Sequence, residues 1–195
     1  MKKTLASFLK VVYSYLFNGI ALLRMGKVGK NIFVRKDLSV VSPKGIFIGD
    51  NSRVGKHCRF ECYVADGKLG KICIGNYTSI NHYCSILCGA DIRIGDYTRM
   101  ASFITIMSEN HGINPEKGIY HKQPLECKEV NIGTYCWLGE KVIVMPGVTI
   151  GDWSIVGAGS LVTKNIPPYS IAVGNPARVI KQYNFETHSW EKPLS

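Results

Sequence analysis

Residues 132–162 read IGTYCWLGEKVIVMPGVTIGDWSIVGAGSLV, and every sixth residue of this stretch is a large aliphatic one. These residues are Ile132, Leu138, Val144, Ile150, Val156 and Val162. An amphipathic helix repeats its apolar positions every three or four residues and a half-buried strand every two, so a period of six fits neither. The period predicts a repeat fold in which three short strands make one triangular turn of about 18 residues, with the aliphatic side chains inward.

Glycine follows the aliphatic residue at positions 133, 139, 151 and 157. We expect each of these glycines to ease a tight corner, because glycine adopts left-handed backbone conformations at little cost. Asn81 occupies the same position in an earlier turn. Taken alone, Asn81 needs no function, since asparagine also tolerates the left-handed conformation.

The period extends upstream with interruptions. Sets of three inward residues begin at residues 28, 48, 74, 94, 132 and 150, so the steps between sets are 20, 26, 20, 38 and 18 residues. The long step marks an insertion at residues 107–129 in an otherwise regular chain. Long excursions from a regular scaffold often carry function.

These hexads resemble those of the hexapeptide-repeat transferases, over about residues 28–182. The resemblance implies an all-β fold, a left-handed parallel β-helix, and assembly as a homotrimer with active sites between subunits. We therefore expect an amphipathic basic helix at residues 1–27, a β-helical acyltransferase domain at 28–182 with the 107–129 loop inserted, and a C-terminal tail at 183–195. The sequence assigns no role to that tail.

The net charge of +10 is concentrated near the N-terminus. Residues 1–36 contain eight lysines and arginines and no acidic residue, which leaves the remainder close to neutral. The seven cysteines include no CxxC pair, and three of them occupy small positions of hexads, so we interpret all seven as reduced packing residues of a cytoplasmic protein. We expect no nucleic-acid partner.

Residues 4–24 have apolar residues at helical spacing, interrupted by Lys10 and Asn18. The interruptions make this segment a poor transmembrane span, and the basic residues that continue beyond it argue against a signal peptide. Two interpretations remain open. The helix could lie on anionic lipid at the inner face of the cell membrane, or it could pack on the end of the repeat or on another subunit.

The insertion contains His111 and His121, and here the resemblance becomes specific to the sugar O-acetyltransferases of the galactoside, maltose and polysaccharide type. Those enzymes place a catalytic histidine 17 residues after the isoleucine of an Ile-Gly-Asp hexad, and an asparagine 13 residues before it. Counted from Ile94, these positions are His111 and Asn81. The strings Trp137-Leu138-Gly139 and GAGSLVTKNIPPYSIAVGNPARVI (residues 157–180) match their later turns closely.

Carried over by position, the resemblance implies that His111 and Asn81 are catalytic, and that six residues bind acetyl-CoA, with no metal required. Those six are Trp137, Gly139, Ala158, Thr163, Lys164 and Arg178. The match departs at Gly89, where relatives place an acidic substrate contact, and at Glu140, which replaces a small polar residue.

The chemistry agrees with these assignments. A sugar hydroxyl becomes a good nucleophile when a base accepts its proton, and an imidazole with a pKa of about 6.5 suits that task near neutral pH. His111 would activate the hydroxyl for direct attack on the thioester, and Asn81 would orient the histidine or the acceptor. Lys164 and Arg178 are suited to the phosphates of CoA.

The sequence thus predicts an acetyl-CoA-dependent O-acetyltransferase that modifies a sugar of a surface polysaccharide such as O-antigen, capsule or exopolysaccharide. Three alternatives stay open. The acceptor could be an amino sugar, acetylated on nitrogen, or a small glycoside. The chain could be a zinc enzyme of the γ-carbonic-anhydrase type that uses His82, His111 and His121, although their spacing differs from that family's. It could also be a structural scaffold without catalysis.

Overall fold

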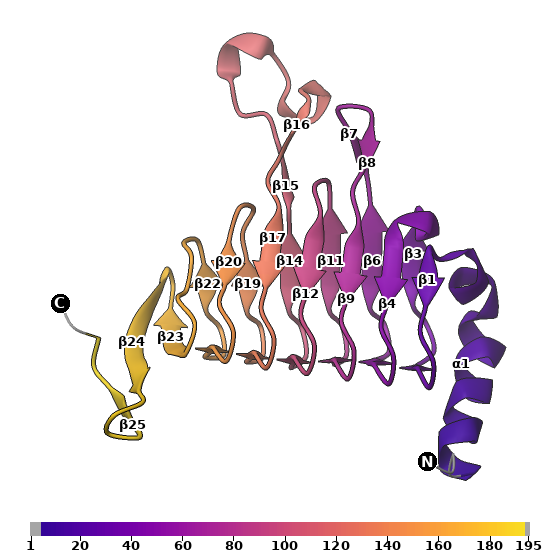
Figure 1. The fold of residues 1–195 in the computed structure, drawn as a ribbon. Coiled ribbons are helices and arrows are strands. Elements are labelled where there is room, and N and C mark those ends of the chain that lie inside the picture. Colours follow the sequence, from indigo (N-terminus) through magenta and orange to yellow (C-terminus); the bar gives the residue numbers. More distant parts are fainter. Residues whose placement is uncertain (1–4, 194–195) are drawn as a thin grey trace.

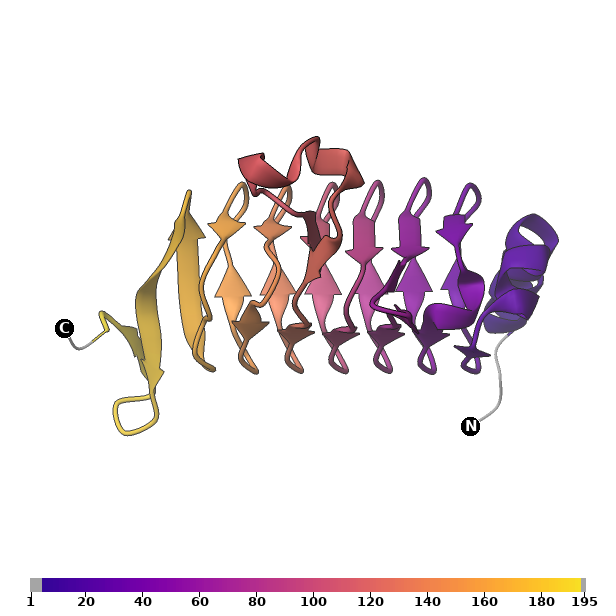
Figure 2. The same cartoon turned by 90° about the horizontal axis from the view of Figure 1, so that it is seen from above.

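The chain winds in successive turns, and each complete turn adds one strand to each of three parallel sheets. The structure, a computed structural model, describes residues 5–193; residues 1–4 and 194–195, including the first part of the expected N-terminal helix with Lys2 and Lys3, lie outside the described residues. Figures 1 and 2 show the turns stacked in a row, with helix α1 (Leu5–Arg24) at one end and an antiparallel hairpin at the other.

Three sheets form the sides of the stack, here called sheets A, B and C. Sheet A contains β1 (Lys27–Val28), β4 (Ile46–Ile48), β9 (Ile72–Ile74), β12 (Ile92–Ile94), β17 (Val130–Ile132) and β20 (Thr149–Ile150). Sheet B contains β2 (Phe33–Val34), β5 (Arg53–Val54), β10 (Ser79–Ile80), β13 (Arg99–Met100), β18 (Trp137–Leu138), β21 (Ile155–Val156), β23 (Ser170–Gly174), β24 (Ala177–Asn184) and β25 (Ser189–Glu191). Sheet C contains β3 (Ser39–Val41), β6 (Arg59–Cys62), β11 (Ser85–Cys88), β14 (Thr105–Met107), β19 (Ile143–Val144) and β22 (Leu161–Val162).

The core lies between the three sheets and includes the residues at the sixfold period. All six period residues from Ile132 to Val162 are buried, as are the corresponding residues of the turns that begin at Ile48, Ile74 and Ile94. Of the three period residues of the first turn, Val34 is fully buried, while Val28 and Val40 are partly buried and pack against the core. The prediction that the aliphatic residues of the sixfold period point inward is therefore confirmed from Ile48 onward.

The expected reason for the glycines is wrong. Glycines 133, 139, 151 and 157 do not have a positive φ. They are needed because neighbouring turns approach closely: a Cβ added to Gly139 would lie 2.5 Å from the backbone nitrogen of Ala158, and one on Gly151 would lie 2.3 Å from the nitrogen of Pro168. Asn81 does not have a positive φ either, so conformational tolerance does not explain it.

Left-handed residues do occur at the corners, two positions after the glycines, and several of them are aromatic. Tyr97 has a φ of 58° and Tyr135 a φ of 55°. At the corner between sheets A and B the rings stack in a ladder of Tyr77, Tyr97, Tyr135 and Trp153, with centroid separations of 4.9, 4.8 and 4.3 Å. Stacking between turns thus offsets the backbone strain of a bulky residue in this conformation.

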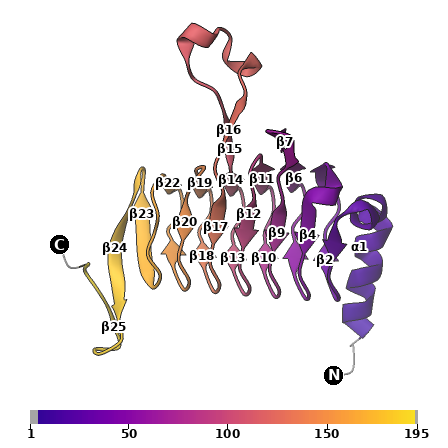
Figure 3. The same cartoon turned by 45° about the horizontal axis from the view of Figure 1, so that its top comes forward.

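Two hairpins leave the stack at the corner between sheets C and A, as Figure 3 shows. The short one pairs β7 (Val64–Ala65) with β8 (Lys68–Leu69). The long one, which we call the arm, pairs β15 (Glu109–His111) with β16 (Leu125–Cys127) and carries the short 3-10 helices η2 (Pro115–Lys117) and η3 (Tyr120–Lys122) at its tip. A third 3-10 helix, η1 (Pro43–Gly45), precedes β4.

At the C-terminal end, β24 and β25 add antiparallel strands to sheet B. Residues 183–184 and 189–191 of the expected tail, to which the sequence assigned no role, therefore belong to that sheet. All seven cysteines are free thiols, and five of them are buried.

Candidate active site

The arm is fixed where it leaves the stack by Ser108, which is completely buried. Its Oγ accepts hydrogen bonds from the backbone N–H groups of Gly89 and Ala90, both at 3.1 Å, and donates one to the carbonyl of Ala90 at 2.6 Å. The carbonyl of Ser108 accepts a hydrogen bond from Lys128 N–H where the chain returns. Both ends of the arm are thus attached to the turn beneath it.

The arm itself is an ordered structure. His111 pairs with Leu125 in the antiparallel ladder, and Gln123 is buried inside the tip. The Gln123 side chain donates to the carbonyls of Asn114 and Gly118 and accepts from Asn114 N–H, at 2.8–3.1 Å. His111 is at the end of β15 with its side chain exposed. These contacts hold a solvent-facing imidazole on a rigid support.

Asn81 is at the corner between sheets B and C, directly after β10, and is exposed. It lines a hollow of about 230 Å³ together with Lys10, Arg35 and Arg53. The adjacent His82 accepts a hydrogen bond from Lys56 N–H on Nδ1 at 3.0 Å. Burial, and then the positive charges of Arg35 and Lys56, lower the pKa of His82. The hollow beside Asn81 is therefore positively charged.

Four of the expected acetyl-CoA residues share that corner or its edge of sheet B. Gly139 and Ala158 are at the corner in successive turns, and Trp137 is the exposed residue of β18 just before it. Arg178 pairs with Val173 near the end of β23, beside the same corner. We call Asn81, Trp137, Gly139, Ala158 and Arg178 the corner group.

The other expected residues are elsewhere. Thr163 and Lys164 follow β22, at the corner between sheets C and A from which the arm also departs. We call His111, Thr163 and Lys164 the arm group. Within one chain the structure therefore divides the eight expected site residues into two groups. One group is at the corner before the strands of sheet C, and the other is at the corner after them.

The gap between the groups is wide. Ser85 and Thr105 pair in sheet C; Asn81 precedes Ser85, whereas His111 is six residues beyond Thr105. At about 3.3 Å per extended residue this corresponds to roughly 20 Å between Asn81 and His111. The two side chains cannot act on one substrate within a single chain, so a site that uses both needs a second copy.

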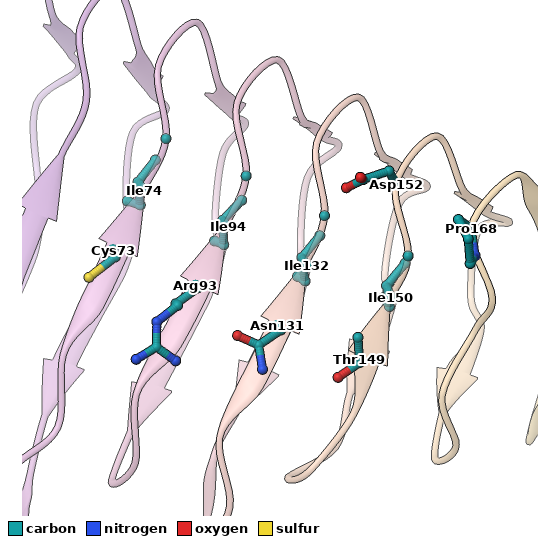
Figure 4. A pocket seen from close by; sticks show the side chains of 14 residues that line it. Cys73, Ile74, Arg93, Ile94, Asn131, Ile132, Thr149, Ile150, Asp152 and Pro168 are labelled. Carbon is teal, nitrogen blue, oxygen red and sulfur yellow. The ribbon is translucent and has the colours of Figure 1, made fainter.

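A shallow groove of about 480 Å³ runs along the outer face of sheet A (Figure 4). Cys73, Arg93, Asn131 and Thr149 project side by side from four successive strands of this face. Arg93 forms ion pairs with Asp91 at 2.8 Å and Glu129 at 2.9 Å, which engage its guanidinium. The groove contains none of the eight expected residues, and we do not assign it the active site.

Gly89, the departure from the relatives' pattern, is beneath the arm. A Cβ at this position would lie 2.5 Å from Cys127 Sγ and 2.7 Å from Glu109 Cβ. Glu109 is two residues before His111 on β15, so both side chains leave the strand on the same side. The arm thus places its own carboxylate, that of Glu109, beside Gly89.

Among residues 5–193 no three histidine, cysteine or acidic side chains gather in one place to hold a metal ion. His82 is at the corner of Asn81, whereas His111 and His121 are on the arm.

The sequence did not reveal the residues that position the site. Ser108 and Gln123 are buried polar residues whose hydrogen bonds shape the arm. A serine at the first residue of an insertion is a faint signal that a single sequence cannot distinguish from any other serine.

Comparison with known proteins identifies the family of this chain. The family model described as bacterial transferase hexapeptide (six repeats) matches residues 129–164. WbbJ of Escherichia coli (strain K12), named as a candidate lipopolysaccharide biosynthesis O-acetyl transferase, is 32% identical over 96% of this chain and 94% of its own. The chain therefore belongs to the hexapeptide-repeat transferases, and it is an acyltransferase.

Two solved structures extend the comparison. A maltose O-acetyltransferase from Clostridium difficile 630 is 30% identical and covers 90% of this chain and 85% of its own, with a TM-score of 0.61. A point mutant of AntD, an N-acyltransferase from Bacillus cereus in complex with dTDP-4-amino-4,6-dideoxyglucose and coenzyme A, is 26% identical, with a TM-score of 0.71 over 87% of this chain and 90% of its own.

Proposed function

We propose that this protein transfers an acetyl group from acetyl-CoA to a sugar hydroxyl of a surface-polysaccharide precursor in the cytoplasm. The observation that carries the proposal is the arm, which holds His111 exposed on a rigid, hydrogen-bonded support within a chain of this transferase family. Its relative named for lipopolysaccharide biosynthesis matches over nearly the whole chain, and this supports a polysaccharide acceptor.

The separation of the two groups supports a homotrimer. In a cyclic assembly of parallel coils, the arm group of one subunit can face the corner group of the next, so that each interface holds one complete site. We infer a left-handed sense for the coil, as the hexads of this family imply.

In such a site the His111 imidazole accepts the proton of the acceptor hydroxyl while the oxygen attacks the thioester carbonyl. The carbon–sulfur bond then breaks, and the CoA thiolate leaves and takes the proton from the imidazolium. Asn81 of the neighbouring subunit orients the acceptor. The acetyl end of CoA runs along Trp137, Gly139 and Ala158, and its phosphates pair with Lys164 and Arg178.

Acetyl-CoA binding tests the proposal without knowledge of the acceptor. Calorimetry should show saturable binding with a Kd at or below roughly 1 mM. Lys164→Ala with Arg178→Ala should weaken binding about tenfold or more, because each substitution removes a charge-assisted hydrogen bond. Lys44→Ala, at the opposite end of the stack, is the matched control and should bind normally. A wild-type protein that does not bind acetyl-CoA would refute the proposal.

Transfer to an amino group is the second candidate, which the similarity to the N-acyltransferase AntD favours. The two products differ chemically, because a sugar acetate ester is removed by mild alkali and an acetamide is not. Mass spectrometry of the product before and after alkali decides between them. His111→Ala should abolish ester formation while acetyl-CoA binding persists.

A further inference from the structure

Helix α1 presents its polar side to the stack and its apolar side to solvent. Its buried residues are Ser14, Asn18 and Leu22. Its exposed side consists of large apolar residues at helical spacing: Leu5, Phe8, Leu9, Val12, Leu16, Ile20 and Leu23. Ile20 is 78% exposed and Leu23 77%, whereas Leu22 between them is 2% exposed. A surface helix of a soluble protein normally has the reverse arrangement.

The reason for this arrangement is the open edge of the first turn. The first turn has no preceding turn to pair with, so some of its backbone groups need other partners. Ser14 Oγ accepts a hydrogen bond from Val34 N–H at 2.8 Å. Asn18 Nδ2 donates to the carbonyls of Val34 at 3.3 Å and Arg35 at 3.1 Å. These bonds fix the rotation of the helix and keep its apolar side outward.

The charged residues around this apolar side are all positive. Residues 5–36 contain no acidic residue, and Arg24, Lys27, Lys30, Arg35 and Lys36 are all exposed. An apolar helix face flanked by cations complements the surface of a bilayer that contains anionic lipid.

We propose that the outward face of α1 docks this enzyme on an anionic lipid bilayer. The helix lies across the end of the stack (Figures 1 and 2), so the membrane plane is transverse to the stack and the turns rise from it. In the proposed trimer, the three helices lie at the same end and bind the membrane together.

Two alternatives to docking, a membrane-spanning helix and a contact with a second copy of this chain, fit the structure less well. By length and composition α1 could cross a membrane, with a mean hydropathy of 1.4, a test that signal sequences also pass. Crossing would break the hydrogen bonds of Ser14 and Asn18 and expose the edge that they cover. A second copy would bring the same cations against this face, and like charges repel.

The docked orientation has a consequence for the acceptor, which rests on the proposed function. Strand β14, which leads into the arm, is three strand spacings from β3, about 15 Å, and the helix adds about 10 Å. Lys10, Arg35 and Arg53 line the hollow that extends from α1 to Asn81. The acceptor is therefore a glycan several sugars long, attached to a membrane lipid through an anionic linker.

Vesicle flotation of the full-length protein tests docking. Wild-type protein should float with phosphatidylcholine vesicles that contain phosphatidylglycerol, and much less with phosphatidylcholine alone. Leu16→Ser with Ile20→Ser should weaken binding about tenfold or more, because both side chains lose burial in lipid. Val64→Ser, a comparable change at a 64% exposed residue of the short hairpin, should bind as wild type. Lys27→Gln with Lys30→Gln should weaken binding to the anionic vesicles.

Circular dichroism and gel filtration show whether each variant is folded and assembled. Three results would overturn docking. Wild-type protein could stay unbound with anionic vesicles. It could also form an assembly twice the size of that of the Leu16, Ile20 variant, which would place a second copy on this face. Finally, it could resist alkaline carbonate extraction from membranes, which would indicate a spanning helix.

A second experiment tests the acceptor assignment. It compares acetylation of one saccharide in its free form and in a lipid-linked form carried by vesicles. The lipid-linked form should be acetylated faster by wild type and by the Val64 variant, but not by the Leu16, Ile20 variant, while all three act equally on the free form. Equal wild-type rates on both forms would overturn the acceptor assignment. If neither form is acetylated while flotation succeeds, the proposed function fails and docking stands.

Discussion

Asn81 and His111 lie beyond opposite ends of two neighbouring strands of sheet C. Asn81 precedes β11, His111 follows β14, and β11 and β14 are paired in parallel. A site that uses both residues must therefore draw them from different chains. This arrangement ties the proposed catalysis to assembly.

Subunit mixing tests this relationship. Asn81→Ala and His111→Ala proteins should each be nearly inactive. Trimers co-expressed from both variants should recover about a quarter of the wild-type sites, because an interface is complete when an intact His111 meets an intact Asn81. Gel filtration controls for assembly. Mixed trimers that assemble but have no activity would show that the two residues act within one chain.

Ser108→Ala should reduce turnover because the root of the arm loses its anchor. The substitution leaves the N–H groups of Gly89 and Ala90 without their partner, which costs about 1–3 kcal/mol. We expect kcat to fall more than the affinity for acetyl-CoA.

Ser52→Ala is the matched control. Ser52 is also buried and also forms hydrogen bonds through Oγ, to the carbonyl of Gly75 and from Thr78 N–H, but it is far from the arm in the sequence of turns. It should lower the unfolding temperature without a comparable loss of kcat. Equal kinetic effects in both variants would mean that Ser108 acts through general stability.

The aromatic ladder should contribute to stability according to the number of stacked neighbours. Tyr97 stacks on Tyr77 and Tyr135, whereas Tyr77 stacks on Tyr97 alone. Tyr97→Ala should therefore reduce the free energy of unfolding by about 1 kcal/mol more than Tyr77→Ala, the worth of one aromatic pair. Chemical denaturation measures the difference. Equal losses would show that the stacking contributes nothing beyond the burial of each ring.

His82 should make stability depend on pH below the ordinary histidine range. Burial and then Arg35 and Lys56 lower its pKa below 6.5, so the unfolded chain binds the proton more readily than the folded protein. The free energy of unfolding is therefore unaffected by His82 well above pH 6.5. It decreases as the pH falls from about 6.5 toward the pKa of His82 in the folded protein.

Nuclear magnetic resonance titration of the His82 ring should give a midpoint below 6.5. His82→Asn, whose side-chain oxygen can accept the hydrogen bond from Lys56 N–H, should remove this part of the pH dependence of the unfolding temperature. An unchanged dependence would assign it to other groups.

The sequence alone identified the core and the arm. A period of six can be read without coordinates because each inward side chain must be apolar, so Ile132, Leu138 and Val144 were recognisable as buried residues. The insertion was visible because it interrupts that period. The resemblance then pointed to His111 and Asn81, whose roles stay proposals.

The tertiary structure decided three matters that the sequence could not. Glycine at 139 is required by the backbone of the next turn rather than by a left-handed φ, because a close approach exists only after the turns stack. The apolar side of α1 faces outward because the open edge at Val34 takes the polar side chains of Ser14 and Asn18. Asn81 and His111 are separated because they lie beyond opposite ends of paired strands. The distance between them is set by the length of those strands once they pair in the sheet, and this pairing is known only from the tertiary structure.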